Sequence, residues 1–229
     1  MALVRRQNGE RAPRAALRHG GLHAHKVDVV FQPTAVTDTC RTTLNISGID
    51  GNETMLITKM QSAATLIAAA LDTNRSLSLI LRASGILSDA AAAEALLRAL
   101  SIARPRLSII SLEGNPAAAD RARIGASLGA LVANTRFGSL NLSGCNLGDE
   151  GLGPLVDALK INTHLSILYC DGNYISEAFA HQRLRPAILA NTGLYTMQLT
   201  PTYGGGAAPA YLRELEQLVK DRVAERRRR

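Results

Sequence analysis

Three histidines near the start of the chain are the first residues whose types suggest chemistry. His19, His23 and His25 carry imidazole rings, which are common zinc ligands. Their spacing matches no standard zinc pattern, and no cysteine lies beside them. The surrounding segment is basic and contains nothing that could form a core. We therefore expect no metal site and no cofactor.

The cysteines and the catalytic residue types give no better case for an enzyme. Cys40, Cys145 and Cys170 form no paired framework, and no signal-peptide-like apolar segment opens the chain, so we expect an intracellular, reducing compartment. No Ser-His-Asp order or carboxylate pair stands out. The run Gly204–Gly206 lacks the Lys-Ser/Thr that follows a phosphate loop. We expect no catalysis and no small-molecule substrate.

A pattern of eleven residues recurs through the middle of the chain and accounts for two of these cysteines. Residues 137–147 (FGSLNLSGCNL) fit L-x-x-L-x-L-x-x-(N/C)-x-L, and residues 165–175 fit it with Cys170 in place of one leucine. A third good copy begins at 107. Weaker copies begin at 41, 77 and 194, with Arg82 where the second of them should have leucine. The spacings between the starts are 36, 30, 30, 28 and 29 residues.

Each copy predicts a short strand, a turn and a helix. The alternating residues of L-x-L give a strand with one buried face. The ninth position, occupied by Asn115, Cys145 and Asn173, can pair backbone groups that the turn leaves open. We expect helices over 90–102, 119–132 and 150–159. Carboxylates at Asp89, Asp120, Asp149 and Glu177 would lie at helix starts, and Asn134, Asn162 and Asn191 at helix ends.

The period and the alternation of Cys and Asn at the turn resemble the ribonuclease-inhibitor-like leucine-rich-repeat family over residues 41–205. This resemblance implies an α/β solenoid shaped as a horseshoe-like arc of about six repeats, with parallel strands on the concave face and helices on the convex face. It also implies protein binding without a common catalytic residue. We expect residues 27–208 to form the solenoid with its N-terminal cap, and residues 209–229 to form a capping helix with a basic tail.

The side chains between the buried leucines should point outward and form a binding face. An apolar set rimmed by serines and acids is typical of a protein-binding patch, although scattered surface aliphatics alone carry no such meaning. The face has almost no positive charge, which argues against a nucleic-acid groove. The candidate contact residues are Leu79, Leu81, Ile109, Glu113, Asn141, Ile167, Tyr169 and Asp171.

The net charge of +7 lies at the two ends of the chain. Residues 1–26 carry +5 and residues 213–229 carry +3, whereas residues 27–212 carry −1. These ends could hold an acidic protein surface such as the tubulin wall or RNA phosphates, or be solvated tails, and the N-terminal arm could also be a mitochondrial targeting sequence. The arginines concerned are Arg5, Arg6, Arg11, Arg14, Arg18, Arg226, Arg227, Arg228 and Arg229.

These features indicate a non-catalytic scaffold that binds other proteins. The first hypothesis is a structural or adaptor subunit of a large assembly, such as the microtubule-based axoneme of a cilium or flagellum, located in the cytoplasm or cytoskeleton. The alternative is a ribonucleoprotein subunit, for instance of the mitochondrial ribosome, which binds RNA through its basic ends. A free-standing adaptor is the third. No apolar run approaches the roughly 20 residues of a membrane span, so we expect no membrane contact.

Overall fold

The computed structural model of the chain describes most of its length from Val27 onward. The described residues are 27–33, 40–46, 76–81, 85–102, 106–117, 120–134, 136–200 and 208–228. The predicted N-terminal arm, with its arginines and histidines, lies outside them, as do Arg82, the run Gly204–Gly206 and Arg229.

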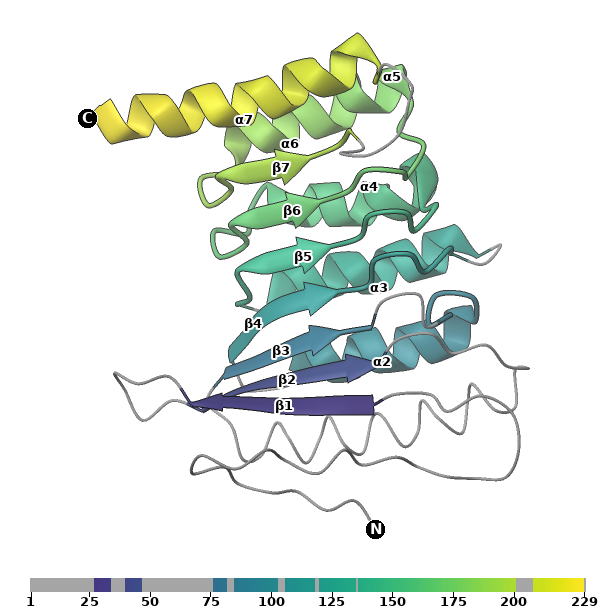
Figure 1. The fold of residues 1–229 in the computed structure, drawn as a ribbon. Helices are drawn as coiled ribbons and strands as arrows, with labels where there is room; N and C mark the ends of the chain where they lie inside the picture. Colours follow the sequence, from purple (N-terminus) through teal and green to yellow (C-terminus); the bar gives the residue numbers. More distant parts are fainter. Residues whose placement is uncertain are drawn as a thin grey trace.

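Seven strands form one sheet in which spatial order follows chain order (Figure 1). The first pair, β1 and β2, is antiparallel, and every later pair is parallel. A parallel neighbour requires a crossover connection, and a helix supplies it between most of these strands. The bounds are β1 Val27–Pro33, β2 Cys40–Ile46, β3 Ser76–Ile80, β4 Arg106–Ser111, β5 Ser139–Asn141, β6 Ile167–Tyr169 and β7 Thr196–Gln198.

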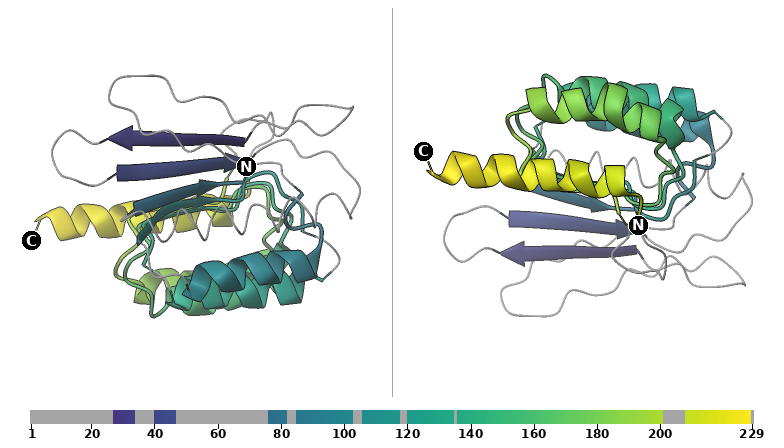
Figure 2. Two further views of the ribbon diagram at one scale, coloured as in Figure 1. Left: turned by 90° about the horizontal axis from the view of Figure 1, so that it is seen from below. Right: turned by 90° about the horizontal axis from the view of Figure 1, so that it is seen from above.

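The helices that connect the strands lie together on one face of the sheet (Figures 1 and 2). The helix predicted over 90–102 has those bounds, whereas the other two begin and end within two residues of the prediction. The chain is thus an α/β protein with a largely parallel sheet, as predicted. The bounds are α2 Ala90–Ile102, α3 Arg121–Asn134, α4 Gly148–Leu159, α5 Glu177–Phe179, the π-helical turn η1 Ala180–Leu184, α6 Arg185–Ala190 and α7 Ala210–Arg228.

The strand register shows that the second copy of the pattern begins one residue earlier than predicted. Leu79 pairs with Leu44 of β2 and with Ile110 of β4, so the copy starts at Ser76 and not at Leu77. The first two spacings are therefore 35 and 31 residues. Leu81 then occupies the position at which the prediction placed Arg82. Because side chains alternate along a strand, this slip of one residue exchanges the buried and open faces of β3.

A continuous aliphatic core fills the space between the sheet and the helices. Along the chain, Ile110, Leu140 and Leu168 align in successive strands, and all three are fully buried. Helices contribute matching residues such as Leu128 and Leu155, which are 0% and 1% exposed. Each buried leucine of this kind contributes about 2 kcal/mol of transfer free energy. The core therefore joins one strand–helix unit to the next without a break.

Helices α3 and α4 approach each other closely because small residues line their contact. A Cβ atom built on Gly125 would lie 2.4 Å from the carbonyl oxygen of Gly151, and one on Gly129 would lie 2.8 Å from the carbonyl oxygen of Pro154. Only glycine fits at these two positions without moving a backbone. These glycines set the spacing between consecutive helices in the middle of the chain.

Helix α7 closes the sheet at the β7 end. Its buried residues Leu212, Leu215 and Val219 belong to the same core as the strands. Glu216 Oε1 accepts hydrogen bonds from the backbone N–H groups of Leu199 and Thr200 at 2.6 and 2.8 Å, so it pairs donors just beyond β7. The predicted C-terminal helix is therefore confirmed, and it is part of the main core. Among the described residues, no helix combines the length and apolarity needed to cross a bilayer.

Candidate protein-binding face

Side chains at the ninth position of the pattern tie consecutive turns together at the edge where the strands end. Asn173 Nδ2 donates to the carbonyl oxygens of Leu142 and Cys170 at 2.8 and 2.9 Å, and its Oδ1 accepts from the N–H of Leu147 at 3.0 Å. Asn115 makes the same type of contacts with the turn before it. The predicted role of the ninth position is confirmed. Its side chains hold consecutive turns together along the edge that borders the sheet.

A second set of asparagines performs the same task where the helices end. Asn191 Nδ2 donates to the carbonyl oxygens of Leu159 and Asn162, both at 2.6 Å, and its Oδ1 accepts from the N–H of Leu194 at 2.7 Å. Asn162 Nδ2 donates to the carbonyl oxygen of Val132 at 2.5 Å. Asn134, at the end of α3, is exposed, and its side chain makes no comparable hydrogen bond to the described residues of the preceding turn.

The helix starts follow the predicted capping only in part. Asp89 Oδ1 accepts hydrogen bonds from the backbone N–H groups of Ala91 and Ala92 at the start of α2. Asp120 Oδ1 accepts one from the backbone N–H of Arg123 at the start of α3. Asp149 instead reaches the next turn, where Oδ1 accepts from the N–H of Ser176 at 2.9 Å and Oδ2 accepts from the Ser176 hydroxyl at 2.5 Å. Ser176 is itself the N-cap of α5. Asp149 and Glu177 lie in the first turns of α4 and α5, as predicted, but neither is the N-cap residue.

The sheet face that no described helix covers, hereafter the open face, presents three parallel rows of side chains. Successive strands place residues of like position beside one another, as the pairings Ser139 with Ile167 and Asn141 with Tyr169 show. All members of the open face except Ser111 are partly exposed. They are Ile80, Ile109, Ser111, Glu113, Ser139, Asn141, Ser143, Ile167, Tyr169, Asp171, Thr196 and Gln198.

Hydrogen bonds across the open face hold its polar side chains in place. Asn141 Nδ2 donates to Glu113 Oε2 at 2.9 Å, and the Ser143 hydroxyl donates to Asp171 Oδ1 at 2.5 Å. The two carboxylates therefore lie in one row with Ser143 between them. Side chains fixed in this way lose little conformational entropy when a partner binds.

The open face differs from the predicted one at its first strand. Leu79 and Leu81, predicted as contact residues, are 0% and 3% exposed and belong to the core. That prediction is wrong, and partly exposed Ile80 takes their place. The structure brings together the other six predicted residues, from Ile109 to Asp171. The prediction missed Thr196 and Gln198, although the alignment of Met197 with Leu168 would have placed them on this face.

Cys145 and Cys170 belong to the core and not to any reactive site. The Cys145 thiol donates to the carbonyl oxygen of Leu112 at 3.1 Å, and burial raises its pKa to about 12. Burial also raises the pKa of Cys170, which is 2% exposed. A thiol with a raised pKa is a poor nucleophile.

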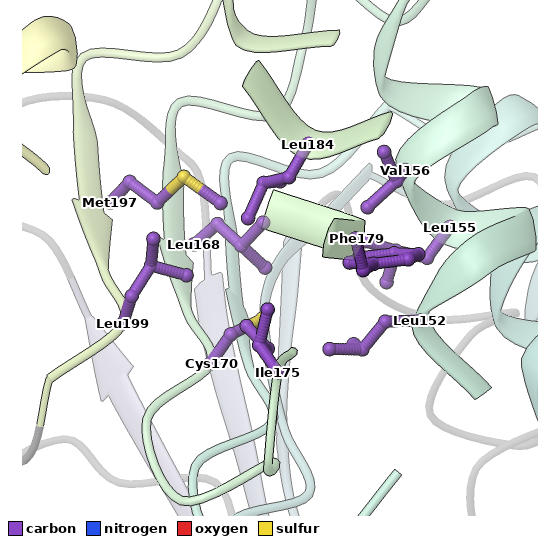
Figure 3. Close-up of a pocket in the computed structure, with 10 residues that line it drawn as sticks. All are labelled: Leu152, Leu155, Val156, Leu168, Cys170, Ile175, Phe179, Leu184, Met197 and Leu199. Atoms are coloured by element: carbon purple, nitrogen blue, oxygen red, sulfur yellow. The ribbon is translucent and has the colours of Figure 1, made fainter. Parts of the chain in front are cut away.

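The cavity behind the sheet is no binding pocket. Ten apolar residues from α4, α5, η1, β6, β7 and the residues that follow these two strands surround about 10 Å³ of space (Figure 3). Leu168 and Met197 face Phe179 and Leu184 across it (Figure 3). A space of this size holds no more than a water molecule, and its apolar lining offers that water no partner. The cavity is a packing gap of the core.

Comparisons with known proteins add no second source of information about this face. No protein-family model matches the chain, and no curated protein matches its sequence. Within the described part of the chain, no group of three or more His, Cys, Asp or Glu side chains could hold a metal ion.

The basic C-terminal residues divide into two kinds. Arg226, predicted to contact a partner, is exposed but donates to the carbonyl oxygen of Thr192, so it also serves the fold. Arg222 donates to the carbonyl oxygens of Ile188, Asn191 and Leu194 and was not singled out by the sequence. Arg227 and Arg228 are exposed at the end of α7.

Proposed function

We propose that the chain is a leucine-rich-repeat solenoid that acts as a non-catalytic scaffold and binds a partner protein on its open face. The observation that carries this proposal is the set of partly exposed Ile109, Ile167 and Tyr169 beside a row of fixed polar groups. Apolar side chains surrounded by satisfied polar groups are typical of protein interfaces. An aromatic residue near the middle of such a surface is a frequent energetic centre of binding.

The leucine-rich-repeat assignment is supported by the agreement of pattern, register and hydrogen bonding. The L-x-L positions align strand by strand from Leu44 to Met197, and sheet order follows chain order. Asn115, Cys145 and Asn173 each bond back to the preceding turn. A stack of units that contact only their neighbours presents an extended surface, which is the usual basis of binding in repeat proteins.

We further propose the assembly role that the sequence suggested, in which the chain is a structural or adaptor subunit of a large complex such as an axoneme. Protein binding on the open face favours this over a ribonucleoprotein subunit, because the described open face carries carboxylates and no Lys or Arg. A ribonucleoprotein role would have to depend on the termini.

Affinity isolation from the source cells tests the proposal. The tagged full-length chain is compared with a variant carrying Ile167→Asp and Tyr169→Asp on the open face, with and without nuclease. We expect the partner protein to be isolated with the full-length chain after nuclease treatment and to be absent when this variant is used. A matched control, Ala126→Asp and Ala130→Asp on the exposed side of α3, should retain it. If the control loses the partner and the open-face variant keeps it, or if nuclease alone removes it, the proposal fails.

A further inference from the structure

Three of the four most exposed large apolar side chains in the described residues lie at one edge of the sheet. Ile161 is 76% exposed just after α4, Leu189 is 56% exposed near the end of α6, and Tyr195 is 48% exposed just before β7. All three lie where helices end and strands begin. Side chains this exposed contribute little to the stability of the fold. Their gathering at one edge is therefore a reason to consider that edge as a binding surface.

The segments before β6 and β7, which carry Ile161 and Tyr195, are stacked directly on one another, and Leu189 lies in α6 just before the second of them. Asn191 Nδ2 donates to the carbonyl oxygen of Asn162 at 2.6 Å, and the N–H of Tyr195 donates to the carbonyl oxygen of Ser166 at 2.9 Å. Ile161 immediately precedes Asn162. The apolar side chains therefore belong to two consecutive turns of one continuous surface.

Basic side chains gather at the same edge. Arg136 and His164 are exposed and precede β5 and β6 at equivalent positions. Helix α7 runs back along the end of the stack, and its C-terminal end reaches this edge (Figures 1 and 2). The bond from Arg226 to the Thr192 carbonyl oxygen anchors it there, next to exposed Arg227 and Arg228.

The opposite edge, where strands end and helices begin, carries more carboxylates than basic side chains, although Arg121, Arg123 and Arg213 also lie near helix starts there. Helix starts favour carboxylates because their backbone N–H groups carry partial positive charge. At the basic end the acids are fewer: Asp157 bonds Lys160 and Arg183, Asp221 accepts from Gln217, and Glu225 lies in α7. The carboxylates of the opposite edge are Asp89, Glu113, Asp120, Asp149, Glu150, Asp171 and Glu177.

We propose that this surface, hereafter the basic edge (Arg136, Ile161, His164, Leu189, Tyr195 and Arg226–Arg228), binds an acidic segment of a partner protein that also carries apolar side chains. Its arginines pair with carboxylates, and its three apolar side chains bury the partner's aliphatic or aromatic residues. A protein fits better than RNA because two of the three apolar side chains, Ile161 and Leu189, are aliphatic and offer bases no stacking surface, whereas Tyr195 alone has a ring. The basic edge shares no residue with the open face, so it is a second contact surface.

Fluorescence anisotropy of the full-length chain with defined probes tests this proposal. The probes are a labelled peptide of repeated Glu-Glu-Leu, a poly-glutamate peptide and a single-stranded RNA oligomer, all of equal charge. Arg136→Glu, Arg227→Glu and Arg228→Glu together form the edge variant. Arg98→Glu, Arg213→Glu and Lys220→Glu together form a control with the same charge change at other exposed sites. Thermal melting confirms that both variants fold.

We expect the Glu-Glu-Leu peptide to bind most tightly, with at least about tenfold loss in the edge variant and little loss in the control. A second variant, Ile161→Ser with Tyr195→Ser, should weaken this peptide and leave poly-glutamate binding unchanged. The proposal is overturned if the edge variant and the control bind the peptide alike. It is also overturned if the RNA oligomer binds more tightly than both peptides and is lost in the edge variant, which would make the basic edge an RNA site. Ile167→Asp with Tyr169→Asp should leave peptide binding unchanged, which separates this test from that of the open face.

Discussion

The buried asparagines show how single side chains hold consecutive turns together. Asn173 pairs two carbonyl oxygens and one N–H group that belong to two different turns. Its side chain is 1% exposed, so water cannot replace these bonds. Each buried backbone group left without a partner costs about 1–3 kcal/mol. The asparagine therefore contributes more to stability than its small contact area suggests.

Asn173→Ala is expected to lower the free energy of unfolding by about 3 kcal/mol, because it leaves these buried groups unpaired. Urea unfolding followed by circular dichroism measures the change. Asn134→Ala removes an exposed asparagine at the end of α3 and serves as the control, with an expected change within about 0.5 kcal/mol. Equal effects of the two substitutions would show that the bonds to Asn173 do not stabilise the stack.

Cys145 and Cys170 should resist thiol reagents in the folded protein. Burial raises the pKa of both Cys145 and Cys170, so neither forms an appreciable amount of thiolate at about pH 8. In a Cys40→Ser variant we expect no reaction with a thiol-specific dye until urea unfolds the chain. Rapid labelling of the folded variant would mean that the turns around Cys145 open readily.

At the residue scale, the sequence predicts the buried positions of the good copies. It fails where the pattern can be placed in two registers that differ by one residue. Leu77, Leu79 and Leu81 alternate through β3 and the residue after it, and Ile80 lies among them. The predicted copy used Leu77 and Ile80, whereas the structure uses Leu79 and Leu81. With leucine or isoleucine on both faces, local pattern could not decide which face is buried. Pairing with β4 decides it.

At the scale of elements, contact between helices depends on glycines that sequence propensity alone would disfavour. Glycine within a helix costs about 1 kcal/mol relative to alanine. Gly125 and Gly129 are retained in α3 because α4 leaves no space for a Cβ. Their cost is offset by the close packing of the two helices.

Gly125→Ala should therefore destabilise the protein by about 2 kcal/mol, despite the higher helix propensity of alanine. The new Cβ would meet the Gly151 backbone at 2.4 Å, which forces the helices apart. In the control Gly153→Ala, the nearest atom belongs to the flexible end of Arg183, and we expect a change below about 1 kcal/mol. Thermal melting distinguishes the two, and a Gly125→Ala protein as stable as the control would contradict this packing.

The guanidinium group of Arg222 should stabilise the turn between α6 and β7. It donates to three backbone carbonyl oxygens, from α6 and from the loop that precedes β7. Arg222→Met keeps the aliphatic stem and removes the donors, so we expect a loss of about 2 kcal/mol in chemical unfolding. Lys220→Met is the control on the exposed side of α7 and should have no effect. Similar stability of both variants would contradict a capping role for Arg222.

The helix between Glu177 and Ala190 shows what the sequence could not reveal at this scale. Pro186 lies inside a continuous helical segment, where it lacks an N–H donor and its ring crowds the preceding turn. The structure accommodates it with the π-helical turn Ala180–Leu184, in which the N–H of Arg185 reaches the carbonyl oxygen of Ala180. A sequence pattern marks the proline as a break and gives no sign of this adjustment.

At the scale of the whole molecule, all strand–helix units run in the same direction, and this shared direction gives the two edges of the sheet different charges. Every unit places its helix start at the same edge, so the carboxylates of successive units accumulate there. The basic end of α7 lies at the other edge (Figure 2). Composition predicted the basic terminus. It could not predict that the C-terminal end of α7 lies at the same edge as Arg136 and His164, because these residues are far apart in the sequence.

The open face was predicted from the same repetition, and six of its eight predicted contact residues lie on it. Repetition explains this success, because a position that is exposed in one unit is exposed in the next. The two errors fall in β3, where the copy of the pattern is weakest. The open-face residues of the last strand were missed because the copy that begins at 194 has threonine, not Asn or Cys, at its ninth position and matches the pattern only weakly.

Photo-cross-linking from the open face tests the central claim most directly. A photoreactive phenylalanine analogue replaces Tyr169 on the open face or, as control, Ala130 on the outer side of α3. Both proteins are irradiated in the source cells, and the products are treated with nuclease and resolved by mass. We predict a discrete adduct with one partner protein from position 169 and none from position 130. An adduct from position 130 with none from position 169, or a product that nuclease destroys, would contradict protein binding on the open face.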